Sequence, residues 1–284
     1  MLIPLQALGL CAAASIFLIM LSLGLAIPPE RLSYLWKQPL PLLRGALSVL
    51  VVVPLVALAL VVMIDLPLPA QFGIMAMAIS PGAPIALRRA LEAGAHGAFA
   101  PCLQIVVVTL AVVTIPLSVE LLDILYFGNA HADPLQIARQ VFIAQLLPLT
   151  LGIGLRKLRP ALAEKIQPSV AKFGNWLFAA LGVVMVVDVW DMAIGVGLLP
   201  ILCALFLAAA SIGIGVLLGS PDPETRPAMA LISTMRNPGL ALLLATSNQM
   251  PPGVIAMILA YVLCVAVVVV PYVAWRRRAG PVGI

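Results

Sequence analysis

The sequence predicts an all-α, multi-pass membrane protein with nine transmembrane helices. Of its 284 residues, 63% are hydrophobic and only 10% are charged, a balance far outside the range of soluble globular domains. Many charge-free runs reach the roughly 20 residues that a transmembrane helix needs, among them 1–29, 45–64, 66–87, 97–119 and 192–221. These runs are continuously apolar, whereas a membrane β-barrel would alternate apolar and polar residues.

Nine spans account for the apolar segments in order along the chain. Seven of them contain no more than isolated prolines, which many transmembrane helices tolerate, and two contain a cluster of proline and glycine. The expected spans lie at about 5–27, 41–64, 69–90, 97–121, 138–155, 171–189, 193–218, 227–248 and 253–275. We expect the whole chain, 1–284, to form a single transmembrane transporter domain.

The distribution of basic residues predicts an orientation. With the N-terminus outside, the inner loops and the tail hold fourteen of the sixteen Lys and Arg residues, the outer loops hold Arg139, and Arg236 lies inside a span. Basic residues concentrate on the cytoplasmic side of membrane proteins. We therefore expect an integral protein of the plasma (inner) membrane, with its N-terminus outside and its C-terminus in the cytoplasm. The inner basic residues are Arg31, Lys37, Arg44, Arg88, Arg89, Arg156, Lys157, Arg159, Lys165, Lys172, Arg226, Arg276, Arg277 and Arg278.

The third and eighth spans are predicted to be broken helices. The third contains Ser80-Pro81-Gly82-Ala83-Pro84, and the eighth contains Asn237-Pro238-Gly239. Prolines remove backbone donors and glycines destabilise a helix interior. Such breaks persist in a membrane only where protein buries them or where they line a cavity.

The positions of the two breaks predict an inverted repeat. Span 3 is third in the group 1–4, and span 8 is third in the group 6–9. The groups are offset by five spans, so they enter the membrane in opposite directions. Paired interrupted helices in corresponding positions of two halves are the sequence sign of a secondary transporter's binding site. Two unrelated kinks are the alternative.

Three segments resemble the bile acid:sodium symporter family: "MLSLGLAIPPERLSYLWKQP" at 20–39, "ISPGAPIALRRALEAG" at 79–94 and "MRNPGLALLLA" at 235–245. The chain resembles the nine-span form of the family. The resemblance implies a core of spans 2–4 and 7–9 (about 41–121 and 193–275), in which the two broken helices cross. It also implies a panel of spans 1, 5 and 6 (about 5–27 and 138–189), and transport by alternating access.

The same resemblance implies that neither family sodium site is intact. Where the second broken helix of the family reads Glu-x-x-Met-Gln-Asn, this chain has Ile232 in place of the acid and Arg236 in place of the glutamine. The Ser-Asn pair of the first broken helix is Ala86-Leu87, and a family glutamine of an earlier helix falls at Val49. Hard cations need oxygen ligands, which these apolar side chains do not supply.

Arg236 is the residue that most needs an explanation, because a charge at mid-membrane costs about 2.5–3.5 kcal/mol on insertion scales. One interpretation is a tethered substitute for sodium, held by free carbonyls at the helix breaks. A second is that it also attracts a carboxylate or sulfonate, and a third is an exposed position at a rim. The candidate substrate-binding residues are Arg236, Asn237, Ser80, Pro81, Gly82, Thr234, Pro238, Gly239 and Gln104.

We therefore expect a secondary transporter that moves a small organic anion without sodium coupling. A sodium-coupled symporter that uses backbone ligands, and a membrane receptor or structural subunit that does not transport, remain alternatives. We expect no enzyme, cofactor or metal site, because the sequence lacks the zinc, phosphate-binding and nucleophile motifs. The expected partners are the lipid bilayer and the anion, with sodium or a proton left open as coupling ion, and no nucleic acid. The sequence does not indicate an oligomeric state.

Overall fold

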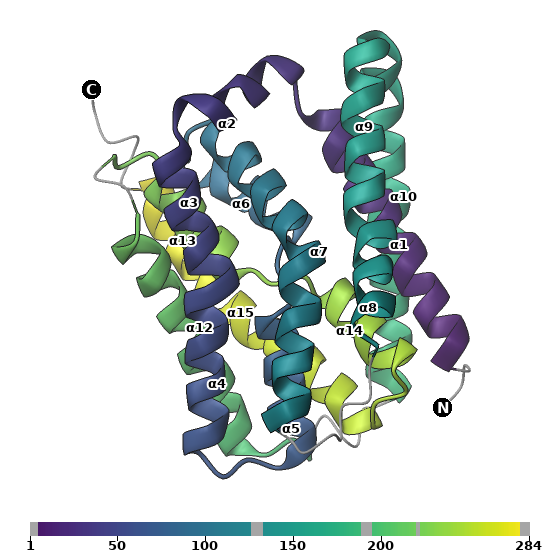
Figure 1. Ribbon diagram of the computed structural model, residues 1–284, viewed down its shortest axis with the longest axis vertical. Helices are drawn as coiled ribbons and strands as arrows, with labels where there is room; N and C mark the ends of the chain where they lie inside the picture. The colour runs from purple at the N-terminus through teal and green to yellow at the C-terminus, as the bar shows by residue number, and fades with distance from the viewer. Residues whose placement is uncertain (1–4, 126–132, 189–194, 220–221, 279–284) are drawn as a thin grey trace. The chain divides into compact units, whose positions relative to one another are not determined.

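The computed structural model describes residues 5–125, 133–188, 195–219 and 222–278 (Figure 1). Every regular element in this part of the chain is a helix, so the predicted all-α class is confirmed. Eight helical segments are long and apolar enough to cross a membrane, and the chain is an integral, multi-pass membrane protein. Residues 189 and 193–194, where the sixth span was expected to end and the seventh to begin, lie outside the described residues.

Six candidate spans keep close to their expected positions, with several boundaries that differ. They are α1 (Leu5–Ala26), the continuous segment α3 (Pro39–Leu47), η2 (Ser48–Val52) and α4 (Val53–Met63), α7 (Phe99–Leu125), the continuous segment α8 (Pro134–Val141), η3 (Phe142–Leu146) and α9 (Leu147–Leu158), α12 (Leu198–Leu217) and α15 (Pro252–Arg278). A short 3-10 helix, η1 (Pro29–Ser33), and α2 (Tyr34–Lys37) follow α1.

One boundary differs most from expectation. The sixth span was expected to start near residue 171, after a basic inner loop, but α10 (Pro160–Asp188) starts eleven residues earlier. Proline suits the first position of a helix, because its fixed φ fits and its missing N–H would have no helical partner there. The basic residues Lys165 and Lys172 consequently lie on α10, and Arg159 alone separates it from α9.

The expected third and eighth spans are each divided into two shorter helices. The third consists of α5 (Leu68–Ala78) and α6 (Pro84–Glu92). Neither helix is long enough by itself to cross a membrane. The eighth consists of α13 (Arg226–Thr234) and α14 (Pro238–Ser247). The described residues thus contain eight candidate spans, and the ninth stays a prediction.

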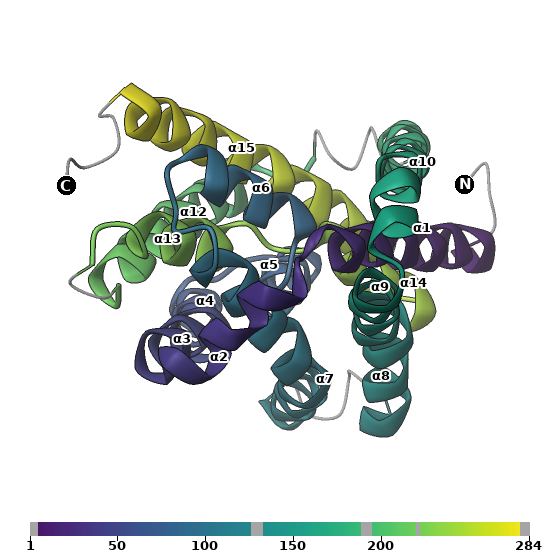
Figure 2. The same ribbon diagram turned by 90° about the horizontal axis from the view of Figure 1, so that it is seen from above.

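The helices form two compact units. The first unit contains Met1–Glu30, Val108–Asp188 and Gly239–Met250. Within it α1 lies against α9 and α10, as Figures 1 and 2 show. The backbones of α1 and α9 touch, since a Cβ on Gly152 would lie only 2.5 Å from the carbonyl oxygen of Leu21.

The second unit contains Arg31–Val107, Val189–Pro238 and Pro251–Ile284. Within it α12 packs against α13 and α15, α15 packs along α5, and α13 packs against α6 (Figure 2). Gly73 allows the close approach of α5 to α15, because a Cβ there would meet the Met257 side chain at 2.5 Å. This unit holds both non-helical stretches that interrupt the expected third and eighth spans.

Candidate functional site

The first non-helical stretch, Ile79–Ala83, joins α5 to α6 and is buried. Pro81 cannot donate a backbone hydrogen bond, and Gly82 has a φ of 84°, a left-handed conformation that a side chain would strain. Pro84 then occupies the start of α6. The predicted residues Ser80, Pro81 and Gly82 therefore lie together in one buried backbone segment.

The second non-helical stretch consists of Met235, Arg236 and Asn237, between α13 and α14. Pro238 and Gly239 are the first residues of α14, and Gly239 belongs to the first unit. Thr234 ends α13, and its hydroxyl donates to the carbonyl of Ala230 at 2.7 Å. Such a bond to the preceding turn is common for hydroxyls in membrane helices, so this hydroxyl is already engaged.

Hydrogen bonds join the two stretches within the second unit. The backbone N–H of Asn237 donates to the carbonyl of Ser80 at 2.8 Å. The amide of Gln104, on α7, donates to the carbonyl of Ala83 at 3.3 Å. The structure therefore brings together Ser80, Asn237 and Gln104, three of the residues that the sequence singled out.

Arg236 lies beside this junction and is buried, with 3% of its surface exposed. The segment that carries it, Arg226–Ser247, is also the most buried of the eight candidate spans, with 89% of its most apolar stretch buried. This burial argues against an exposed rim position. One guanidinium nitrogen, Nη1, donates to the carbonyl oxygen of Val49 at 2.9 Å.

This partner differs from the one expected, because Val49 lies in the second span and not at either helix break. The reason is the π-helix η2, in which each N–H reaches five residues back. The N–H of Val53 donates to Ser48, and the next residue is Pro54, which has no N–H. In an α-helix the N–H of Val53 would donate to the carbonyl of Val49, but here it donates to Ser48. In the π register the donor would be residue 54, which is a proline. The Val49 carbonyl therefore has no donor in its own helix, and Arg236 supplies one.

A second contact fixes the same π-helix to α13. The hydroxyls of Ser48 and Ser233 are 2.7 Å apart and both side chains are wholly buried. Ser48 precedes Val49, and Ser233 lies three residues before Arg236. The two bonds together hold the Val49 carbonyl and the guanidinium in register.

Several polar atoms of the second unit have no hydrogen-bond partner among the described residues. They are Nε and Nη2 of Arg236, Oγ of Ser80, Oε1 of Gln104 and the hydroxyl of Tyr261 on α15. Tyr261 is wholly buried and close enough to Arg236 to interact electrostatically. Within the described part of the chain Arg236 forms no ion pair, so its charge is not neutralised by a carboxylate there.

Sequence reasoning missed three participants: Tyr261, the Ser48–Ser233 pair and the Val49 carbonyl. Pro54 signals that one carbonyl of the preceding turn lacks its donor, but in an α-helical register this would be the carbonyl of Leu50, and only the π register makes it that of Val49. Nothing in the sequence marks Tyr261 as close to Arg236, because the contact between α15 and α13 depends on tertiary packing.

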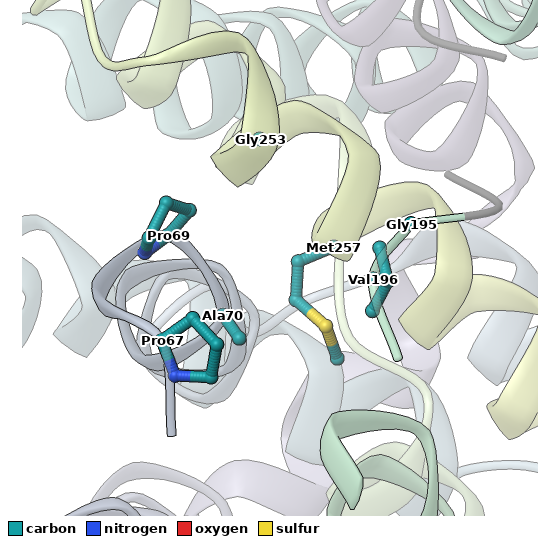
Figure 3. A pocket seen from close by; sticks show the side chains of 7 residues that line it. All are labelled: Pro67, Pro69, Ala70, Gly195, Val196, Gly253 and Met257. Atoms are coloured by element: carbon teal, nitrogen blue, oxygen red, sulfur yellow. The ribbon is translucent and has the colours of Figure 1, made fainter. Parts of the chain in front are cut away.

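A pocket elsewhere in the second unit contains none of the predicted site residues. It has a volume of about 250 Å³, and Figure 3 shows Pro67, Pro69 and Ala70 on one side and Met257 with Val196 on the other. Its lining offers no charged or hydrogen-bonding side chain. No group of three or more His, Cys, Asp and Glu side chains that could hold a metal lies in the described part of the chain.

The model of the sodium bile acid symporter family matches residues 13–195, more than half of the chain. The match confirms the resemblance seen in the sequence. It includes the stretch at Ile79–Ala83 and ends before the segment that carries Arg236. No curated protein matches the sequence.

Proposed function

We propose a function from one premise: this chain belongs to the sodium bile acid symporter family. The protein is a secondary transporter that moves an organic anion across the membrane by alternating access. It works without the sodium coupling of the family, because the guanidinium of Arg236 takes the place of a bound cation.

The observation that carries this proposal is the bond from Arg236 to the carbonyl of Val49. By the resemblance, Val49 stands where the family has a sodium-coordinating glutamine. The other positions of the implied sodium sites, Ile232, Ala86 and Leu87, are buried and apolar. A fixed cation therefore binds an oxygen at a place where the implied ion ligands have been lost, and guanidinium stays protonated at all ordinary pH values.

The remaining donors of Arg236 support an anionic substrate. A buried charge without a neutralising partner is costly, and Nε and Nη2 have no acceptor among the described residues. A carboxylate or sulfonate would accept from both, in the two-pronged geometry that guanidinium favours. The hydroxyls of Ser80 and Tyr261 could add donors to the same group.

The resemblance also implies that the spans belong to two groups, a core and a panel, and we include this in the proposal. We propose that spans 2–4 and 7–9 form the core that holds Arg236, and that spans 1, 5 and 6 form the panel. Nine spans, two crossing broken helices and an inverted repeat would give the alternating access that moves the substrate.

Uptake into proteoliposomes tests the proposal against its alternatives. The purified protein is reconstituted, and labelled cholate is presented outside in choline chloride. We expect saturable uptake above that of protein-free liposomes, and its loss in Arg236→Ala. Saturable binding without uptake would favour a receptor, and uptake that appears only when sodium replaces choline would favour a sodium-coupled symporter.

A further inference from the structure

A cluster of arginines lies where two helices of the second unit meet. Arg88 and Arg89 belong to α6, and Arg276 and Arg277 belong to the last turn of α15. The two helices contact each other, and Figure 2 shows them side by side. We call these four residues, together with Glu92 at the end of α6, the arginine patch. Four positive charges and one negative charge give the patch a formal net charge of +3.

One carboxylate holds three of these guanidinium groups in place. Nε of Arg88 and Nη1 of Arg89 each donate to an oxygen of Glu92, at 3.0 and 2.9 Å. Nη2 of Arg277 reaches the same carboxylate from α15 at 2.6 Å. A guanidinium has five N–H donors, and each of these bonds uses one nitrogen. The three arginine side chains are 81%, 40% and 51% exposed in this order, so they keep donors that a ligand can reach.

The arginine patch lies at the end of a helix that is long and apolar enough to cross a membrane. The charged residues of α15 are confined to its last three positions. Trp275 is 60% exposed, its ring lies 5.9 Å from that of Tyr272, and the guanidinium of Arg276 lies 6.0 Å from its centre. Tryptophan and tyrosine concentrate where the hydrocarbon of a membrane meets water. We therefore expect the patch at the level of the lipid headgroups.

The charges of the arginine patch favour one class of headgroup. Guanidinium binds phosphate oxygens in a two-pronged geometry, whereas lysine acts only as a point charge. The one carboxylate of the patch is already shared by three arginines. It is therefore not available to hold the cationic choline of a zwitterionic lipid. A phosphate without an accompanying cation fits the patch better.

We propose that the arginine patch binds the phosphate group of an anionic phospholipid. The occupant is a lipid and not a free anion, because the exposed ring of Trp275 beside the patch offers an apolar surface to the acyl chains. The alternative is that these arginines serve only to orient the span, as basic residues at span ends often do. That role predicts no preference among lipids for the folded protein. The proposal does not depend on what the protein transports.

Lipid binding to the full chain tests the proposal. The purified protein in detergent receives phosphatidylglycerol or phosphatidylcholine with the same acyl chains, and native mass spectrometry gives the apparent dissociation constant of each lipid. Arg88→Gln with Arg276→Gln removes two charges, while the bond from α15 to Glu92 remains. The matched control is Lys165→Gln with Lys172→Gln, which removes two charges from exposed positions of α10.

We expect the parent to bind phosphatidylglycerol at least ten-fold more tightly than phosphatidylcholine. The glutamine variant of the patch should lose most of this preference, and the lysine control should keep it. A parent without the preference, or a patch variant that behaves like the control, overturns the proposal. Displacement of the lipid by an equal concentration of glycerol 3-phosphate also overturns it, because the patch would then be a site for a free anion.

Melting temperatures without added lipid guard against misfolding. The glutamine variant should melt close to the parent, because Arg88 is largely exposed and Arg276 forms no ion pair among the described residues. If it melts far below the parent, Arg88→Lys with Arg276→Lys, which keeps both charges, decides the matter. This variant should still bind phosphatidylglycerol more tightly than phosphatidylcholine, and equal binding of the two lipids overturns the proposal.

Discussion

At the scale of single residues, the bond between Arg236 and Val49 decides how a charge is tolerated in an apolar interior. Its cost on insertion scales is about 2.5–3.5 kcal/mol. A hydrogen bond to a charged group stabilises the folded protein by about 1.5–3 kcal/mol. One such bond is present in the described structure, so the guanidinium is under-satisfied among the described residues, and we propose that an anion supplies the missing acceptors.

We predict that Arg236→Ala destabilises the protein by about 1–3 kcal/mol, because it leaves the buried Val49 carbonyl without a donor. Arg236→Lys keeps a charge but loses the planar fork, so its melting temperature should be intermediate. Arg278→Ala is the matched control, since Arg278 is exposed and has no ion pair within the described residues. If Arg236→Ala has the same melting temperature as the parent, the arginine has no structural role.

The importance of Arg236 could be predicted from the sequence, and its partner could not. It is the one charge between Pro227 and Trp275, so composition alone singles it out. The Val49 carbonyl is a backbone group that becomes available only through the π register at Ser48–Val52. Hydrophobic patterning cannot predict which register a helix adopts around a proline.

At the scale of helices, close backbone contact holds the first unit together. We predict that Gly152→Ala lowers the melting temperature clearly, because the new Cβ would lie 2.5 Å from the Leu21 carbonyl and α1 would have to move away from α9. Overpacking of this kind typically costs about 1–3 kcal/mol. Gly154→Ala, on the same helix but with open space around its Cβ, should melt like the parent or slightly higher. Equal losses in the two variants would contradict this packing account.

Helix ends are also tied by charge, as Glu92 shows. Its carboxylate pairs with Arg88 and Arg89 on its own helix, and with Arg277 of α15 at 2.6 Å. Burial by itself raises the pKa of Glu92, but the bonds from Arg89 and Arg88 and the charges of Arg89 and Arg277 lower it below its ordinary value. The stabilisation is therefore present above the unfolded-state pKa of a glutamate and lost as the pH falls through the lower, folded-state pKa.

We predict that Glu92→Gln melts below the parent at pH 7 and that the difference shrinks in acid. The loss at pH 7 should be about 0.2–1 kcal/mol, the usual range for exposed pairs. Melting curves between pH 7 and pH 3 check it, with Glu120→Gln as control, because Glu120 is exposed and forms no ion pair in the described structure. A difference that is constant with pH would show that the carboxylate is not the group involved.

The sequence predicted the helices well where apolar runs are long, and less well where helices extend beyond the membrane. The bounds expected for the span at 97–121 agree with those of α7 within a few residues, because the apolar sequence there is uniform. The start of α10 could not be placed, because the segment after Pro160 carries charges that read as a loop and still forms a helix. Both interruptions were visible, because the clusters at Pro81-Gly82 and Pro238-Gly239 oppose helix formation directly.

At the scale of the whole molecule, the distribution of basic residues predicts the orientation in the membrane. We predict that single cysteines placed at Ala130 and Gly280, in a background without native cysteines, are labelled from opposite sides of the membrane. An impermeant maleimide applied to intact cells should react with the first and not with the second. Labelling of both from outside would refute the nine-span topology and, with it, the inverted repeat.

Two substitutions should restore part of a sodium site. Arg236→Gln with Ile232→Glu replaces the fixed cation by two oxygen ligands of the kind that the family resemblance implies. Sodium should then stabilise this double variant, at least partly, although Ala86 and Leu87 still provide no ligand. The double variant is thus the positive control for the measurement that bears on the parent.

The most direct test of the central claim is the melting temperature of the parent protein in sodium chloride and in potassium chloride at equal ionic strength. An ion that binds only the native state raises stability with its concentration, by about 2.7 kcal/mol at one hundred times its dissociation constant. If Arg236 replaces the bound cation, the two melting curves should coincide at every salt concentration. A rise that is specific to sodium and saturates with its concentration would contradict the claim that this transporter has exchanged sodium for an arginine.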